Sequence, residues 1–373
     1  MKKLITLLML VVMLFGVAAC AVSEPEDVQP EDTEAADAPS VPDEEEEVEL
    51  VKMNVAVMPY QISLPVFHAI ENNLDEEYGL ELEMVMFANG ATMNEAMASD
   101  QFDVTLTGGA GIYGIATYDG VYISDAVYYM KPDDGEPSGG DGIYCLADNP
   151  ATETRGFNPD YPNLYGDPDS IKGSTILYTS GTTAHQLVIM WLNAMGVGLD
   201  EVNMLNMDFA QSYQALTAEQ ADFACLTSPY TTQAQDAGYA SVADGKSLHQ
   251  NSVESIMAPR SYYENNKENL AKFLNMIYES NRMLEEGGID YKVEWMEKWY
   301  DYNGTDYTDE EVYAEFALGE FVTWDNMDTV EYGAYAHWVA DFYNLNELLT
   351  DEAVENVSNN IVTDVMELAR SME

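Results

Sequence analysis

The chain has 373 residues, with 67 Asp and Glu against 14 Lys and Arg and a formal net charge of −53 at pH 7. This excess of acidic residues excludes a nucleic-acid-binding protein, because contacts to phosphates require a basic surface. It also disfavours docking of the folded part on an anionic membrane surface.

The first 20 residues have the pattern of an export signal. Lys2 and Lys3 precede an uncharged apolar run from Leu4 to Val17, and small residues then lead to Cys20. A basic start, a short apolar stretch and small residues before a cleavage point are typical of a secretory signal peptide. The end of the segment resembles the lipobox of bacterial lipoproteins. This resemblance implies that Cys20 is diacylated and becomes the first mature residue.

An uncleaved anchor helix is the alternative for this segment. Residues 4–23 carry no charge, and about 20 apolar residues are enough to span a bilayer. The small, weakly apolar residues before and after Cys20 favour the lipoprotein signal. Both alternatives place the rest of the chain outside the cytoplasm. We therefore expect an extracytoplasmic protein that is lipid-anchored to the bacterial cell membrane.

Residues 21–50 have the composition of a disordered tether. They hold 13 acidic residues and four prolines, with no Lys or Arg and almost no large apolar side chain. Such a segment buries too little apolar surface to offset the entropy lost on ordering. Charge repulsion and proline keep it extended.

The remaining cysteines and histidines do not form a metal motif. Cys145 and Cys225 each lie in an apolar stretch, so they are either a disulfide pair or two buried thiols. We favour buried thiols, because free Cys is among the most buried residue types. The four histidines are far apart in the sequence. We expect no metal and no cofactor.

Residues 51–130 alternate between strand and helix patterns. Strands are predicted at 53–60, 80–86 and 102–106. Ser63 is the predicted cap of a helix that ends at Gly79, and a capping box at 92–95 predicts a second, short helix. This order is typical of an α/β lobe with a largely parallel sheet.

The same unit returns later in the chain. Residues 95–109 align without gaps on residues 214–228, with three identities at an offset of 119. In this second copy, strands are predicted at 174–178, 203–207 and 223–226. A helix through 186–195 ends at Gly196. The repeat predicts a chain with two lobes.

The C-terminal third is rich in aromatic residues. Helices are predicted at 261–286 and 309–320, and aromatic residues crowd residues 291–342. Aromatic side chains at helical spacing are core residues more often than binding residues, and we expect this of Tyr313, Phe316 and Phe321. Trp324 is a candidate to reach a binding cleft.

Several segments resemble the solute-binding proteins of ABC importers for nitrate, sulfonates and taurine, a family that also includes binders of thiamine pyrimidine precursors. The resemblance lies in segments 55–61, 78–83, 87–92, 95–109, 171–176, 180–185 and 222–230. It implies the α/β type II periplasmic-binding-protein fold, in which two α/β lobes are joined by hinge strands. Lobe 1 would hold residues 51–130 plus 253–373, and lobe 2 would hold residues 131–252. Residues 131–142 and 149–170 are loop insertions relative to the family pattern.

The resemblance also implies a function. We expect a monomeric binding protein that captures a small-molecule solute between its lobes and delivers it to the permease of an ABC importer. We find no acid–base pair or nucleophile motif, so we do not expect an enzyme. An exported enzyme or a lipid-anchored sensor of the same fold remains the alternative.

Five polar loops at predicted strand ends are the candidate binding site, because ligands of open α/β sheets lie beyond the carboxyl ends of the strands. Any one of these residues could be only a turn or helix-cap residue, but the loops together favour a cleft. None of the loops contains Lys or Arg, which favours a neutral or weakly cationic solute over nitrate or a sulfonate. The candidate ligand-binding residues are Tyr60, Gln61, Asn89, Thr107, Gly108, Gly109, Ser180, Thr182, Thr183, Ser228 and Tyr230.

Overall fold

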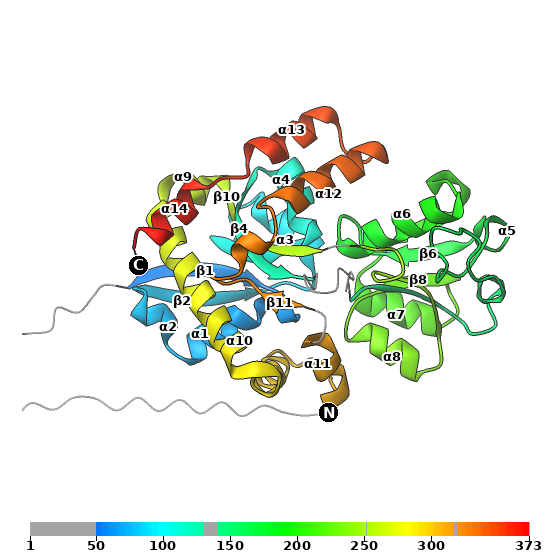
Figure 1. The fold of residues 1–373 in the computed structure, drawn as a ribbon, viewed down its shortest axis with the longest axis horizontal. Helices are drawn as coiled ribbons and strands as arrows, with labels where there is room; N and C mark the ends of the chain where they lie inside the picture. The colour runs from blue at the N-terminus through cyan, green and yellow to red at the C-terminus, as the bar shows by residue number, and fades with distance from the viewer. Residues whose placement is uncertain (1–49, 130–139, 251, 317–318, 373) are drawn as a thin grey trace, which may run out of the picture. The chain divides into compact units, whose positions relative to one another are not determined.

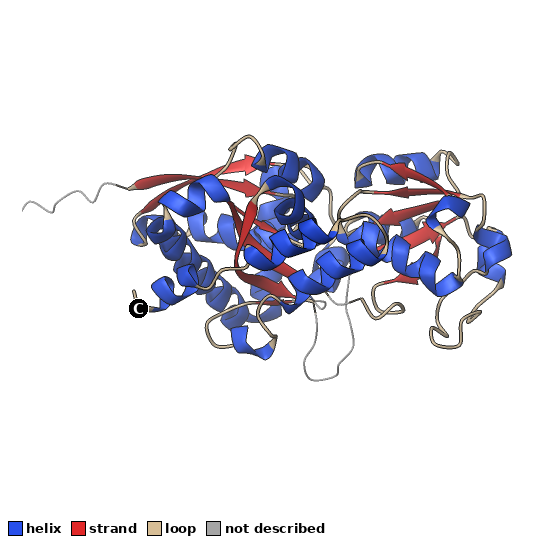
Figure 2. Ribbon diagram, turned by 90° about the horizontal axis from the view of Figure 1, so that it is seen from above, coloured by secondary structure: helices blue, strands red, loops and turns tan. Residues whose placement is uncertain are grey.

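The computed structural model describes residues 50–129, 140–250, 252–316 and 319–372. The predicted signal peptide, the lipobox with Cys20 and residues 21–49 of the predicted tether lie outside these ranges. The described residues form two β-sheets, each covered by helices (Figures 1 and 2). This arrangement confirms the predicted α/β class. No helix in the described ranges is both long and apolar enough to cross a membrane.

The first sheet has the strand order β11-β4-β10-β3-β1-β2. Strands β2 and β3 pair parallel with β1, and the other pairs are antiparallel. Strand β3, inside the sheet, is buried along its whole length, as expected for a parallel strand that is covered by helices on both sides. The strands are β1 (Val51–Val57), β2 (Leu80–Met86), β3 (Val104–Thr107), β4 (Gly120–Tyr128), β10 (Val253–Pro259) and β11 (Glu320–Phe321).

The helices between and after these strands pack around the first sheet (Figure 1). The 3₁₀ turns are η1 (Gln61–Ser63) and η4 (Met327–Thr329). The helices are α1 (Leu64–Glu71), α2 (Leu74–Glu77), α3 (Gly90–Met97), α4 (Gly109–Tyr118), α9 (Arg260–Asn265), α10 (Lys267–Asn303), α11 (Asp309–Phe316), α12 (Ala334–Leu345), α13 (Asp351–Asn359) and α14 (Asp364–Arg370).

The second sheet has the order β7-β6-β8-β5-β9. Its strands are β5 (Gly142–Cys145), β6 (Thr175–Tyr178), β7 (Asn203–Asn206), β8 (Phe223–Leu226) and β9 (Ala240–Asp244). Its helices are α5 (Pro168–Ile171), α6 (Thr183–Met195), α7 (Phe209–Thr217) and α8 (Tyr230–Asp236), with 3₁₀ turns η2 (Pro150–Glu153) and η3 (Leu199–Glu201).

The two sheets repeat one topology. In each, a parallel trio (β2-β1-β3 or β7-β6-β8) is followed by an antiparallel strand that arrives from elsewhere in the chain. Adding the predicted offset of 119 to the bounds of β3 gives the bounds of β8, and adding it to the first residue of α3 gives that of α7. The repeat seen in the sequence is therefore a repeat of structure.

Two helix starts differ from the sequence prediction. The Ser63 hydroxyl does not cap α1, because it accepts the N–H of Met58 at 2.8 Å. The predicted helix from Ser63 to Gly79 is two helices, since Asn73 has a left-handed φ of 58°. Helix α3 begins at Gly90, where the side chain of Asn89 accepts two backbone N–H groups. Asn89, and not the predicted box at 92–95, is therefore the cap.

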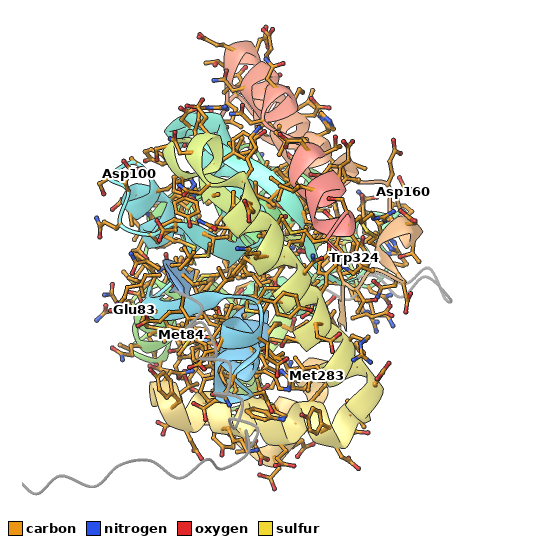
Figure 3. All side chains as sticks on the ribbon, turned by 90° about the vertical axis from the view of Figure 1, so that its left-hand side faces the viewer. Glu83, Met84, Asp100, Asp160, Met283 and Trp324 are labelled. Atoms are coloured by element: carbon orange, nitrogen blue, oxygen red, sulfur yellow. The ribbon has the colours of Figure 1, made fainter. Side chains whose placement is uncertain are left out.

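The aromatic C-terminal third is mostly core, as predicted. Phe316 and Phe321 are buried, but Tyr313 is 53% exposed, so the prediction for Tyr313 is wrong. Trp324, labelled in Figure 3, donates its indole N–H to Asn275 at 3.1 Å and packs against Tyr278 of α10. Its contacts are therefore with α10, and it does not line the cavity described below.

Cys145 and Cys225 are buried free thiols. They lie on neighbouring strands, β5 and β8, but the register pairs Cys225 with Ile143. This confirms the preference for buried thiols over a disulfide.

Helix α10 is interrupted at Gly288, where φ is 77° and ψ is −176°. This backbone conformation is essentially restricted to glycine. A Cβ at this position would have no atom within 4 Å, so substitution would strain the backbone without a steric clash.

We predict that Gly288→Ala lowers the free energy of unfolding by about 1–3 kcal/mol, measured by urea denaturation of the full-length protein. Asp290→Ala is the control, because Asp290 is exposed on the same helix and has a helical backbone. Equal stability of the two variants would show that the backbone at Gly288 is not strained by a side chain.

Candidate functional site

A cavity of about 130 Å³ lies at the carboxyl ends of the parallel strands of both sheets. The first sheet contributes the residues after β1 and β3, and the second contributes the start of α6 and the residues after β8. Asp141, directly before β5, and Gln250, between β9 and β10, also line it. The cavity is therefore built from both halves of the repeat.

Nine of the eleven candidate residues line this cavity. They come from loops that are up to 168 positions apart in the sequence (60 to 228), and the fold brings them together. Their contact with a solute stays a prediction. The nine are Tyr60, Gln61, Asn89, Thr107, Gly108, Gly109, Thr182, Thr183 and Ser228.

Ser180 and Tyr230 are not among the residues that line the cavity. The backbone N–H of Ser180 donates to Asn206, and the neighbouring Gly181 lies against Tyr113 of α4, so this part of the loop contacts protein. The ring of Tyr230 packs on Tyr213, with centroids 5.9 Å apart. Tyr230 begins α8 and is directed toward α7 by this contact.

Tyr60 bridges the two sheets at the cavity. Its hydroxyl donates to the carbonyl of Ala88 at 3.1 Å, and its ring meets that of Phe209 edge-on at 6.4 Å. The indole of Trp299 donates to the Tyr60 carbonyl at 3.2 Å, which fixes the backbone. Burial raises the pKa of Tyr60 far above its usual value, so this hydroxyl stays neutral.

Three carboxyl groups that were not predicted from the sequence also line the cavity: Asp141, Glu254 and Glu315. Asp141 accepts hydrogen bonds from the hydroxyls of Thr183 and Thr227. Glu315, from α11, accepts the hydroxyl of Tyr300 at 2.8 Å.

Glu315 also links the two sheets. Besides Tyr300, it accepts the backbone N–H of Gln61 on the side of the first sheet and the hydroxyl of Ser228 on the side of the second. Glu254 lies on β10, and its Oε1 is 3.6 Å from the position of a Cβ on Gly108. The carboxyl groups thus lie among the predicted binding residues.

The pKa values of these groups are raised, because burial penalises the charged form. Burial and the charges of Asp141 and Glu315 raise the pKa of Glu254 to about 8. Burial raises the pKa of Glu315 to about 7 and that of Asp141 above its usual range. Each carboxyl group therefore holds a proton to a higher pH than it would in water.

No Lys, Arg or His occurs among the described residues that line the cavity. A unit charge about 4 Å from an ionised carboxylate interacts with it by ~4 kcal/mol at an effective dielectric constant of 20. The interaction is favourable for a cation and unfavourable for an anion. The carboxyl groups of the cavity therefore disfavour an anionic solute such as nitrate or a sulfonate, as expected from the sequence.

Three buried polar atoms in the cavity wall have no hydrogen-bond partner within the described protein: Gln61 Nε2, Thr107 Oγ1 and Glu254 Oε2. Gln61 and Thr107 are each 1% exposed. A buried polar group without a partner costs about 1–3 kcal/mol, and such groups are usually satisfied by water or a ligand. These atoms are therefore positioned to bind a polar molecule in the cavity.

The chain is similar to known proteins in sequence. Residues 46–293 match the model of the NMT1-like family. A protein of Brachyspira hyodysenteriae (strain ATCC 49526 / WA1), whose name describes an ABC transporter periplasmic binding protein, is 29% identical over 364 residues, which cover 98% of this chain and 97% of the relative.

Solved structures share the fold at low sequence identity. The alkanesulfonate-binding protein SsuA from Xanthomonas axonopodis pv. citri, bound to MOPS, superposes with a TM-score of 0.64 and 14% identity, covering 84% of this chain and 99% of that protein. The periplasmic nitrate-binding protein NrtA from Synechocystis PCC 6803 superposes with a TM-score of 0.62 and 14% identity, covering 87% of this chain and 90% of that protein. Since the family model spans well over half of the sequence, the chain belongs to the NMT1-like family.

Proposed function

We propose that this protein is an extracytoplasmic solute-binding protein that captures a small polar solute in the cavity and delivers it to an ABC importer. The observation that carries the proposal is the cavity itself, which equivalent strand ends of two repeated sheets line together. The relative from Brachyspira hyodysenteriae supports the link to an ABC transporter. We assign residues 51–130 plus 253–373 to lobe 1 and residues 131–252 to lobe 2.

The contacts across the cavity explain how capture would work. Tyr60 with Phe209, and Glu315 with Ser228, join the two lobes at the cavity rim. A solute that contacts both lobes favours the closed arrangement by its differential affinity for it. The importer permease could then recognise the closed form.

The experiment is a thermal-shift screen of the full-length protein, purified in a non-ionic detergent, against a library of small metabolites. A solute that binds the folded state raises the melting temperature by mass action. The same solute should be recovered chemically unchanged after incubation, since we propose binding without catalysis by a monomer. A product peak would favour the exported-enzyme alternative, and a library without any stabilising member would count against solute capture.

We further propose that diacylated Cys20 anchors the protein to the membrane. We predict that Cys20→Ser moves most of the protein from the membrane to the soluble extracytoplasmic fraction, because the folded part is too acidic to bind an anionic surface. Cell fractionation with an antibody measures this. Cys145→Ser is the control, since Cys145 is a buried thiol and its loss leaves any lipid in place. Membrane retention of the Cys20 variant would favour the uncleaved anchor helix.

A further inference from the structure

The cavity holds three carboxyl groups that no basic side chain of its described lining neutralises when they ionise. Asp141, Glu254 and Glu315 lie in its wall, and the described residues around them include no basic side chain that lines the cavity. Buried carboxyl groups without a cationic partner either take up protons or meet a cation that enters from outside. A bound solute is the group that can supply this cation.

The unpartnered polar atoms show where a solute would make hydrogen bonds. Gln61 and Thr107 are each 1% exposed and line the cavity. The side-chain nitrogen of Gln61, the hydroxyl of Thr107 and Oε2 of Glu254 have no partner among the described residues. These atoms come from three different segments of lobe 1 that line the same cavity.

The hydroxyl of Tyr129 couples Glu254 to Gln61. It forms a hydrogen bond with Glu254 and lies 3.5 Å from Oε1 of Gln61. The hydroxyl has one hydrogen, so it cannot donate to both. When Glu254 is protonated, it donates to Tyr129, Tyr129 donates to Gln61, and the Gln61 nitrogen faces the cavity.

The opposite state follows when Glu254 is ionised. Tyr129 then donates to Glu254, and the Gln61 amide turns so that its N–H₂ donates to Tyr129, because an amide presents a donor on one side and an acceptor on the other. Oxygen atoms of Glu254 and Gln61 then both face the cavity. In this state the site accepts hydrogen bonds from a donor-rich solute.

We infer that the solute is a small organic cation with more than one N–H group, which donates to Glu254 and Gln61 beside Asp141 and Glu315. This inference rests on the proposed function. An ammonium, an amidinium or a protonated amino-heterocycle has this chemistry. Met58, Ile62 and Phe209 give the cavity an apolar wall for the organic part, and the ring of Tyr60 offers a face that attracts a cation.

The inference predicts that affinity rises with pH. The groups that face Glu254 are Asp141, Glu315, Tyr129 and Tyr335. With a pKa of about 8, Glu254 is mostly protonated at pH 6, and a cation must displace that proton. For the release of one proton, affinity for a permanent cation should increase about fiftyfold from pH 6 to pH 8.

The probe is a metabolite extract of bacterial cells and complex growth medium, separated on cation- and anion-exchange resins at pH 7. Each fraction is tested for its effect on the melting temperature of the full-length protein in a non-ionic detergent. We expect the stabilising activity in the fraction that the cation exchanger retains. Activity retained by the anion exchanger, or by neither resin, would overturn the inference and leave solute capture intact. If no fraction stabilises the protein, the proposed function itself fails.

The active fraction is then titrated from pH 6 to pH 8 with wild type, Glu254→Gln and Glu83→Gln. Glu83 is exposed on the edge strand β2, so its variant loses the same charge away from the cavity (Figure 3). The Glu83 variant should keep the wild-type increase. The Glu254 variant should bind more weakly at pH 8 and show a smaller increase, about tenfold or less, because only Glu315, with a pKa of about 7, then releases its proton in this range. A wild-type affinity that does not change with pH, or falls as pH rises, would contradict the role of Glu254.

Discussion

Replacing Tyr60 by alanine should weaken solute binding about thirtyfold, because truncation of a central aromatic contact typically costs ~2 kcal/mol or more. Tyr60 lines the cavity, and its ring contacts Phe209 of the other lobe. Phe209→Ala should have an effect of the same order. Isothermal titration of each variant with the solute found by screening measures the loss.

Tyr230→Ala is the matched control for this pair. Tyr230 was predicted to bind the solute as Tyr60 does, but its ring packs on Tyr213 and it is not among the residues that line the cavity. We expect its affinity to change less than about threefold. An effect of Tyr230→Ala as large as that of Tyr60→Ala would mean that the solute does not bind in the cavity described here.

Replacing Trp299 by alanine should lower the free energy of unfolding by about 3–5 kcal/mol, the usual cost of removing a buried tryptophan. Trp299 lies on α10 and is completely buried. Its ring centroid is 5.3 Å from that of Phe67 and 5.8 Å from that of Tyr302, which stacks on it. Its loss also removes the hydrogen bond to the Tyr60 carbonyl. Urea denaturation of the full-length protein measures the stability. Titration with the solute measures whether the loss of this hydrogen bond also lowers the affinity of the site that contains Tyr60.

Trp338→Ala is the control for the loss of a tryptophan. Trp338 is 39% exposed on α12, where it stacks on Tyr335 and Phe342. We expect a cost of about 1 kcal/mol or less and unchanged affinity. If the two tryptophan variants were equally stable, Trp299 would not be part of the core that supports the cavity.

The sequence predicted the elements whose patterns are local. Strand β3 and its equivalent β8 were found because a helix, a turn and an apolar strand recur at a constant offset. The predicted loops then fell mostly on one cavity, since the carboxyl ends of parallel strands meet at one edge of a sheet. Ser180 and Tyr230 do not line the cavity, because this part of each loop contacts Asn206, Tyr113 or Tyr213, and no local pattern shows such contacts.

The carboxyl groups could not be predicted in the same way. Asp141, Glu254 and Glu315 are separated by 113 and 61 positions, and they arrive from a connecting segment, an antiparallel strand and a C-terminal helix. In a chain with 67 acidic residues, these three cannot be singled out by residue type alone. The one local hint is Glu254, a single acid in the otherwise mostly apolar strand β10. The absence of Lys and Arg from the predicted loops did indicate that the site has no positively charged side chain to bind an anion.

The most direct test of solute capture between two lobes is a distance measured across the cavity. Spin labels at Glu95→Cys and Gln214→Cys, which are exposed and equivalent positions on α3 and α7, report the separation of the lobes by double electron–electron resonance. Cys145 and Cys225 are replaced by alanine in the same full-length chain. We predict that saturating solute narrows the distance distribution and moves it to shorter distances, as both lobes close on the solute. A distribution that stays unchanged while the solute binds would contradict capture by closure.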